Sequence, residues 1–204
     1  MGCDIHLFLE RKNNDGSWYD ANTYRRNDYK TMNPEENTEP DFKRLDFYYG
    51  RNYDLFAILA GVRNYDFIKP ISQPKGLPVN ASKEVKDELM EWGEEAHSVS
   101  YLTLLELLEA RPIYQEIKCS GFIKTEDAQL LDEKGIIPRE YSQGVFGKGT
   151  ENRYVKREWI EKSDLLGGFI NKILASLETT YLYWEKERII EHAEKIRVIF
   201  WFDN

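Results

Sequence analysis

Residues 196–202, Ile-Arg-Val-Ile-Phe-Trp-Phe, constrain the fold most, because every residue but the arginine is apolar. A run of β-branched and aromatic residues of this length predicts a β-strand. At the other end of the chain, residues 3–10 alternate, with Ile5, Leu7 and Leu9 on one face. We therefore expect the two terminal strands to be neighbours in one sheet, which would hold both ends of the chain together.

Other elements follow from local signals. The turn Asn-Asn-Asp-Gly at 13–16, followed by Ser-Trp-Tyr, predicts a β-hairpin with the first strand. Residues 22–47 are polar and lack a clear period, so we predict a long loop there, and the prolines of 64–81 predict a second, ordered loop. Apolar periodicity and capping residues predict strands at 113–123 and 153–161, and helices at 53–62, 82–92, 103–110, 126–134 and 163–193.

This order of elements predicts an α+β fold. Its sheet should be small and mostly antiparallel, joining the N-terminal hairpin to the C-terminal strand, with helices packed on it. A chain of 204 residues favours one domain spanning 1–204, and an aromatic content of 14% argues against disorder.

Charge and cysteine content limit the partners. The net charge of −8 opposes binding to extended nucleic acid, whereas two or three arginines suffice to hold a small anion. Two cysteines are too few for a disulfide scaffold and no signal peptide is recognisable, so we expect a cytoplasmic protein. No apolar run approaches the roughly 20 residues of a membrane span.

Asp4 and His6 lie two residues apart on the first strand, so their side chains should point to the same side. An Asp-x-His pair in this position is typical of several metal-dependent phosphoesterases. The rest of that pattern is missing, since His6, His97 and His192 are isolated from one another. We predict no cofactor and no tightly bound metal, with structural hydrogen bonds as the alternative role of the pair.

A second group of candidate ligand-binding residues surrounds the helix predicted at 53–62. Asp54 suits the positive end of the helix dipole, whereas Arg51 opposes it and therefore needs a partner, either a structural carboxylate or a ligand phosphate. The alternative for each arginine is a surface ion pair. The group comprises Arg51, Tyr53, Asp54, Arg63, Asn64 and Lys75.

A third group is His97, Ser98 and Ser100, placed between a helix that ends at a glycine and a helix with a capping box. Backbone N–H groups and hydroxyls in such a loop can bind an anion. The alternative is that Ser98 or Ser100 only caps a helix.

Several short segments of the sequence resemble those of a family of mostly uncharacterised tailed-phage proteins. They are Met-Gly-Cys-Asp-Ile-His at 1–6, Phe-Trp-Phe-Asp-Asn at 200–204, and the segments 51–64, 76–78 and 97–103. The resemblance implies a phage-encoded, non-virion protein of the host cytoplasm. By analogy with small acidic phage proteins, it implies a counter-defence factor that sequesters a nucleotide immune signal, such as a cyclic dinucleotide or a cyclic ADP-ribose derivative.

Three functional hypotheses result, and we rank a binding module first. It would hold a small phosphorylated nucleotide through the residues above, without catalytic residues, and a second copy of the chain is a possible partner. The second is a phosphodiesterase in which Asp4, His6 and His97 converge, completed by Asp54 or Asp203. The third is an acidic inhibitor of a host protein.

Overall fold

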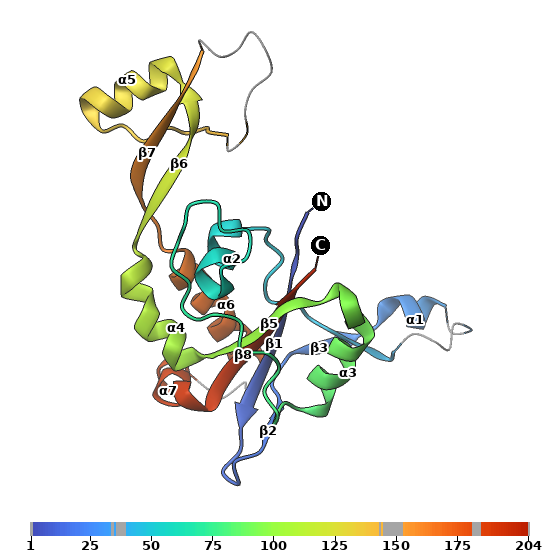
Figure 1. Ribbon diagram of the computed structural model, residues 1–204. Coiled ribbons are helices and arrows are strands. Elements are labelled where there is room, and N and C mark those ends of the chain that lie inside the picture. The colour runs from blue at the N-terminus through green and yellow to red at the C-terminus, as the bar shows by residue number, and fades with distance from the viewer. Residues whose placement is uncertain are drawn as a thin grey trace.

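The computed structural model has an α+β fold built on a four-stranded antiparallel sheet with strand order β2–β1–β8–β5 (Figure 1). The strands are β1 (Ile5–Lys12), β2 (Trp18–Asp20), β5 (His97–Thr103) and β8 (Ile196–Phe202). Ile5 lies opposite Phe202 and Arg11 opposite Ile196, so the prediction that the terminal strands are neighbours is confirmed. The structure describes residues 2–33, 35, 40–142, 144, 153–180 and 185–203.

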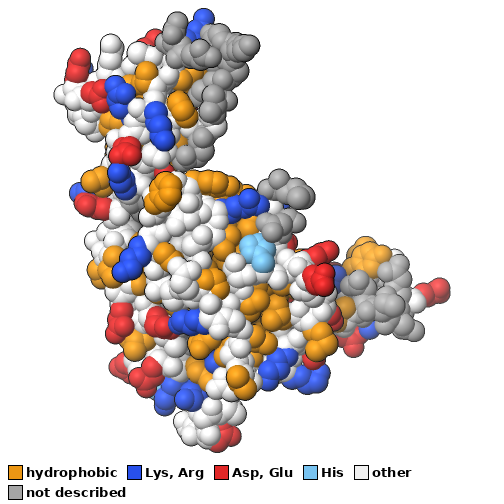
Figure 2. All heavy atoms as spheres, viewed as in Figure 1, with side chains coloured by type: hydrophobic (Ala, Val, Ile, Leu, Met, Phe, Trp, Pro, Cys, Tyr) orange, Lys and Arg blue, Asp and Glu red, His pale blue; other side chains and the backbone are white. Residues whose placement is uncertain are grey.

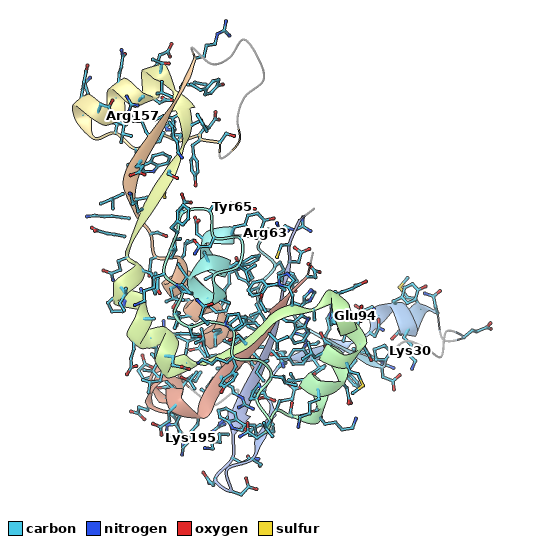
Figure 3. The ribbon with its side chains drawn as sticks, in the orientation of Figure 1. Lys30, Arg63, Tyr65, Glu94, Arg157 and Lys195 are labelled. Atoms are coloured by element: carbon cyan, nitrogen blue, oxygen red, sulfur yellow. The ribbon has the colours of Figure 1, made fainter. Side chains whose placement is uncertain are left out.

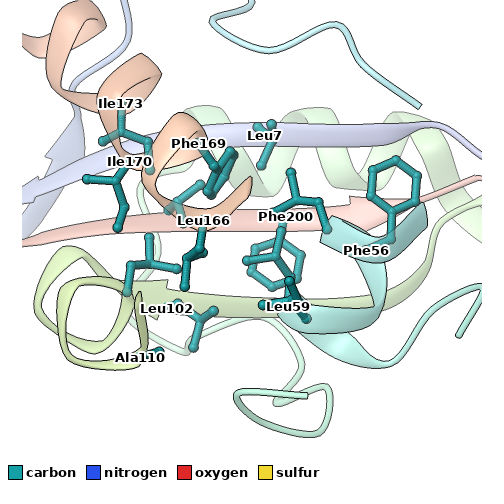
Figure 4. Close-up of a cluster of buried hydrophobic side chains, with 14 of the residues drawn as sticks. Leu7, Phe56, Leu59, Leu102, Ala110, Leu166, Phe169, Ile170, Ile173 and Phe200 are labelled. Atoms are coloured by element: carbon teal, nitrogen blue, oxygen red, sulfur yellow. The ribbon is translucent and has the colours of Figure 1, made fainter. Parts of the chain in front are cut away.

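Helices cover both faces of this sheet. On one face Leu7, Leu102 and Phe200 pack against α2 (Tyr53–Ala60), α4 (Leu104–Ala110) and α6 (Leu165–Thr180), as Figure 4 shows. On the other face Phe8 and Trp201 pack against α3 (Lys83–Trp92). Because β8 is central and covered on both sides, all seven of its residues are buried, which explains its nearly unbroken apolar sequence.

The helix boundaries follow the capping signals in part. The predicted capping box of α4 is present, with Thr103 and Glu106 bonding each other's backbone N–H groups. Gly61, with φ of 75°, ends α2 in the left-handed conformation. The side chain of Ser82 makes no capping bond to α3; its backbone N–H instead donates to Oε1 of Glu10 at 2.6 Å. Ser82 therefore connects α3 to the sheet.

The prediction of one long loop at 22–47 is wrong. This segment contains β3 (Tyr24–Arg26), α1 (Asp28–Met32) and β4 (Phe42–Arg44), and β3 pairs with β4 in a separate antiparallel ribbon. Arg44 ties the ribbon to the body, because it bonds the Leu7 carbonyl and Glu88 and lies 3.9 Å from the Phe8 ring. Elements this short and polar carry no hydrophobic periodicity, so the sequence pattern did not reveal them.

A segment in the second half of the chain forms an arm that projects from the body (Figure 1). It consists of β6 (Glu116–Lys124), α5 (Thr125–Lys134) and β7 (Tyr154–Lys162), as predicted. β6 and β7 pair along their full length, from Glu116 opposite Lys162 to Lys124 opposite Tyr154. Cys119, Ile123, Ala128 and Trp159 are the buried apolar residues of these elements.

The helical region predicted from Ser163 is divided. The Ser163 hydroxyl accepts from the N–H of Leu165 at 3.3 Å, after which α6 runs to Thr180. A second helix, α7 (Lys186–Glu191), and a 3₁₀ turn (Ala193–Lys195) then lead into β8; further 3₁₀ turns are η1 (Gly93–Glu95) and η2 (Arg111–Tyr114). Residues 181–184, between these two helices, lie outside the described residues. Across the described ranges, no helix is both long and apolar enough to span a membrane.

Candidate functional site

The antiparallel order of β1, β8 and β5 places the start of β1, the end of β8 and the start of β5 at the same end of the sheet. The loops flanking α2 reach this end as well, because residues before and after the helix contact the start of β1. Six side chains meet there, and we call them the strand-end cluster: Cys3, Asp4, His6, Arg51, Arg63 and Asp203.

His6 is held by Asp203. Its Nε2 lies 3.1 Å from Oδ2 of Asp203, whose Oδ1 accepts the backbone N–H of Asp4 at 2.8 Å. The imidazole also lies against Trp92, with ring centroids 4.0 Å apart. The two side chains are 20% and 22% exposed, so this hydrogen bond is sheltered but reachable from solvent.

Arg51 binds Asp4 in a two-point pair, with Nε and Nη2 each donating to one carboxylate oxygen. This lowers the pKa of the Asp4 carboxyl below its ordinary value. A Cβ on Gly2 would lie 2.5 Å from Nη1 of Arg51, so the glycine lets the guanidinium approach the chain. The Arg51 and Asp4 side chains are 57% and 45% exposed, which makes this a surface pair of small stabilising effect.

Arg63 contacts Cys3, the residue that precedes the Asp4 partner of Arg51. Its guanidinium is hydrogen-bonded to the Cys3 thiol and the Tyr65 hydroxyl, and Figure 3 shows Arg63 and Tyr65 beside the end of α2. Burial raises the pKa of the Cys3 thiol, although Arg63 opposes the shift, so Cys3 is not an activated nucleophile. Arg63 has φ of 51°, a left-handed conformation that is uncommon for a residue with a side chain.

His97 lies at the same end of the sheet, opposite Phe202, with ring centroids 6.0 Å apart. Its Nδ1 is 3.1 Å from the Ser98 hydroxyl, while its Nε2 is buried without a hydrogen-bond partner in the described part of the chain. Ser98 has φ of 52°, where the β5–β8 register shifts. The predicted interhelical loop at 97–100 is wrong, because pairing with β8 makes these residues a strand.

Lys75 and Ser100 lie together but away from the cluster's hydrogen bonds. Lys75 Nζ donates to Glu106 at 2.8 Å, and the Lys75 backbone N–H donates to the Ser100 hydroxyl at 3.2 Å. Ser100 is fully buried, so its hydroxyl fixes the 64–81 loop onto β5. The structure thus assigns both residues stabilising contacts.

Asn64 and Tyr53 shape the loop after α2. The Asn64 side chain accepts the N–H of Ile68 at 2.8 Å and donates to its carbonyl at 2.6 Å, which closes a tight loop. The Tyr53 ring lies 5.7 Å from Phe56 and 6.3 Å from Tyr65. Tyr53 therefore lies near both Tyr65 and Arg51.

Asp54 faces the arm rather than the cluster. It lies near Asp66 and Glu161, and we call these three residues the junction acids. Asp66 accepts the N–H and the hydroxyl of Ser120 on β6, at 3.0 and 3.1 Å. Burial raises the pKa of Asp54, and the other two carboxylates raise it further; burial and the same acids raise the pKa of Cys119 to about 12.

Asp54→Asn is expected to stabilise the protein at pH 7 and to leave its stability at pH 3 unchanged. A carboxyl whose pKa is raised by folding favours the folded state at low pH, and that contribution is lost as the pH rises through the folded value. At pH 7 the ionised Asp54 opposes folding, and asparagine removes this effect. Thermal unfolding at both pH values measures it. Glu133→Gln removes the same charge from an exposed position of α5, and an equal gain there would contradict the assignment.

Other surface features do not add to the cluster. Among the residues that the structure describes, no group of three or more His, Cys, Asp and Glu is arranged to hold a metal ion. Three cavities, of about 460, 440 and 370 Å³, lie elsewhere in the described structure. They are lined by residues around α1, by residues where β6 meets α5, and by residues of the arm and loop 66–69, respectively. On the face shown in Figure 2, basic and acidic side chains are interspersed and do not form one basic surface.

The sequence identified His6, Arg51, Arg63 and His97 without showing that they meet at one end of the sheet. Two contacts were not foreseen: the Arg63–Cys3 contact and the tilted ring contact between Trp92 and His6. Each contact joins residues far apart in the chain, so no local sequence pattern predicts it. Comparisons of the chain with protein-family models, with curated proteins and with solved structures found no match.

Proposed function

We propose that the strand-end cluster binds a small phosphorylated ligand of the nucleotide class and releases it unaltered. The observation that carries this proposal is the convergence of two guanidinium groups. Arg51 precedes α2 and Arg63 follows it, yet they contact the adjacent residues Asp4 and Cys3. Two guanidinium groups that reach adjacent residues of the chain suit the oxygens of one phosphate or of a diphosphate.

Exposed tyrosines beside the arginines support a ligand that also carries a base. Tyr65, which is bonded to Arg63, is 51% exposed, and Tyr49, two residues before Arg51, is 78% exposed. A tyrosine ring accepts a nucleobase by stacking, which contributes about 1–3 kcal/mol per base. Phosphate donors and stacking surfaces together favour a nucleotide over inorganic phosphate.

The charge balance limits the size of the ligand. Arg51 and Arg63 are accompanied by the carboxylates Asp4 and Asp203, so the cluster carries no large excess of positive charge. A ligand phosphate must share the Arg51 guanidinium with Asp4. This favours a ligand of one or two phosphates over a polyanion.

Sequestration without cleavage is supported by the chemistry of the cluster. Its cysteine is buried with a raised pKa, and the cluster offers no serine or threonine hydroxyl beside His6. The resemblance to tailed-phage proteins suggests the biological setting, in which the ligand is a nucleotide immune signal such as a cyclic dinucleotide or a cyclic ADP-ribose derivative.

Arg51→Ala and Arg63→Ala are each expected to weaken nucleotide binding about ten- to thirtyfold, the loss of one charged donor from a partly exposed site. The melting temperature of Arg51→Ala should change little, because its exposed ion pair with Asp4 contributes at most about 1 kcal/mol. Calorimetric titration against a panel of cyclic dinucleotides and ADP-ribose derivatives measures the first effect, and thermal unfolding the second.

Arg111→Ala is the matched control, because Arg111 also forms a two-point pair with an aspartate, Asp164, at similar exposure. It should leave binding unchanged. Wild-type binding that neither cluster variant weakens would place the ligand elsewhere, and no binding across the panel would favour a protein target.

A phosphodiesterase is the second candidate, favoured by the His6–Asp203 hydrogen bond. A carboxylate that orients an imidazole is the usual support of a general base. Chromatography of the ligand recovered after titration separates the two functions. Intact ligand supports sequestration, whereas cleaved ligand whose formation stops in His6→Ala supports the enzyme.

A further inference from the structure

The outer edge of β7 presents backbone groups that are available for another strand. Ser163 and Gln115, and Thr125 and Arg153, are bonded across the ribbon, so the alternation of an antiparallel pair points the N–H and C=O groups of Lys156, Glu158 and Ile160 away from β6. Within the described residues, these three make no backbone hydrogen bond on that side; the Lys156 carbonyl accepts only from the side chain of Arg157, at 3.1 Å.

The opposite edge of the ribbon is closed by the protein itself. The outward N–H of Ser120 on β6 donates to Asp66, and Phe122 exchanges two backbone hydrogen bonds with Ser142. A long strand edge without such protection pairs readily with another chain. The arm is therefore protected on the β6 side, whereas no described residue covers the β7 side, where Ile160 is 61% exposed.

We propose that this edge pairs with β7 of a second copy of the chain, forming a symmetric dimer through a continuous four-stranded antiparallel sheet. The sequence of β7 is complementary to itself about Arg157. In that register Lys156 of each copy lies opposite Glu158 of the other, and Tyr154 lies opposite Ile160. Opposite charges and apolar pairs placed directly across a sheet contribute roughly 0.2–1 kcal/mol each, and every such pair occurs twice.

The charges on β7 favour this register over two nearby alternatives. Centring the pair on Glu158 would place two glutamates face to face, and centring it on Trp159 would set Lys156 against Lys162. The register about Arg157 brings the two Arg157 residues together, but each is already neutralised, because Nε and Nη2 bind Asp132 of α5 at 2.9–3.1 Å. Glu158 is likewise paired within its own chain, with Lys118 of β6 at 2.6 Å. The register about Arg157 is preferred because, of the three, only it sets Lys156 opposite Glu158.

Sedimentation equilibrium of the full-length protein tests the dimer, with an expected mass twice that of the 24.1 kDa chain. Lys156→Glu should weaken the dimer at least about tenfold, because it sets glutamates opposite each other twice. Glu158→Lys should do the same. Mixing the two variants should restore a dimer of one copy each, since both cross-strand pairs then regain opposite charges.

Glu158→Pro tests the edge independently of charge. The Glu158 N–H points away from β6, so proline there removes no backbone hydrogen bond within the monomer but blocks an added strand. The side-chain pair with Lys118 that is also lost is exposed and contributes at most about 1 kcal/mol. The variant should keep the wild-type melting temperature when measured as a dilute monomer, and it should remain monomeric at high concentration. A wild-type protein that stays monomeric up to about 200 μM would overturn the proposal, as would a dimer that survives Glu158→Pro or a mixture that fails to restore it.

Discussion

A chain that lacks residues 197–204 is expected to yield no soluble, folded protein. The deletion removes nearly all of β8, which lies between β1 and β5 and is bonded to both. Its loss would leave two strands without their shared partner and would uncover both layers of the core.

The energetic reason is the burial of the strand. Val198, Ile199, Phe200, Trp201 and Phe202 are each at most 1% exposed. Burying one such side chain stabilises a fold by about 1.5–3 kcal/mol. The summed contribution of the five side chains is therefore comparable to the whole free energy of unfolding of a typical domain, about 5–15 kcal/mol. The soluble fraction after expression, followed by circular dichroism of any recovered protein, measures the outcome.

A milder test of the same point compares the substitution of phenylalanine by alanine at a buried and at an exposed position. Phe200→Ala should lower the free energy of unfolding by about 3–5 kcal/mol, because Phe200 is fully buried. Phe67→Ala should change it by less than about 0.5 kcal/mol, because Phe67 is 92% exposed. A well-folded truncated chain, or equal effects of the two substitutions, would contradict the central position of β8.

Glu10→Ala is expected to lower the free energy of unfolding by about 3–5 kcal/mol, the cost of leaving a buried charge without its partner. Glu10 is fully buried, and its Oε2 accepts from Nε of Arg197 at 2.7 Å. Arg197 is 3% exposed, bonds Asn80 at 3.0 and 3.2 Å, and lies 3.9 Å from the Trp18 ring. Removing the carboxylate therefore leaves a guanidinium held in the protein interior.

Urea unfolding measures the change, with Lys83→Ala as the control. Lys83 pairs with Asp87 on the surface of α3, where its side chain is 82% exposed, so this variant should lose at most about 0.5 kcal/mol. Replacing both buried partners, as in Glu10→Leu with Arg197→Met, should be less harmful than Glu10→Ala alone, because no charge is left unpaired. A single variant as stable as the wild type would show that the pair carries little energy.

The predictable part of the fold depends on signals that are local in sequence. The alternation of 3–10 and the apolar run 196–202 determine the two terminal strands, and the residues around Thr103 and Glu106 determine the start of α4. The ribbon within 22–47 was missed because its stability comes from Arg44 contacts with Leu7 and Glu88, which no local period records.

The same distinction applies to the candidate site. The sequence by itself determined which residues stand out, including Arg51 and Arg63 on either side of a helix and His6 on the first strand. Only the tertiary structure decided that both arginines contact the residues just before β1 and that Asp203 orients His6. It also decided that Lys75 forms an ion pair with Glu106. The physical reason is that each of these contacts joins segments that are distant in sequence and meet only in the folded chain. His6 and Asp203, for example, are 197 positions apart and are brought within hydrogen-bonding distance by the pairing of β8 with β1.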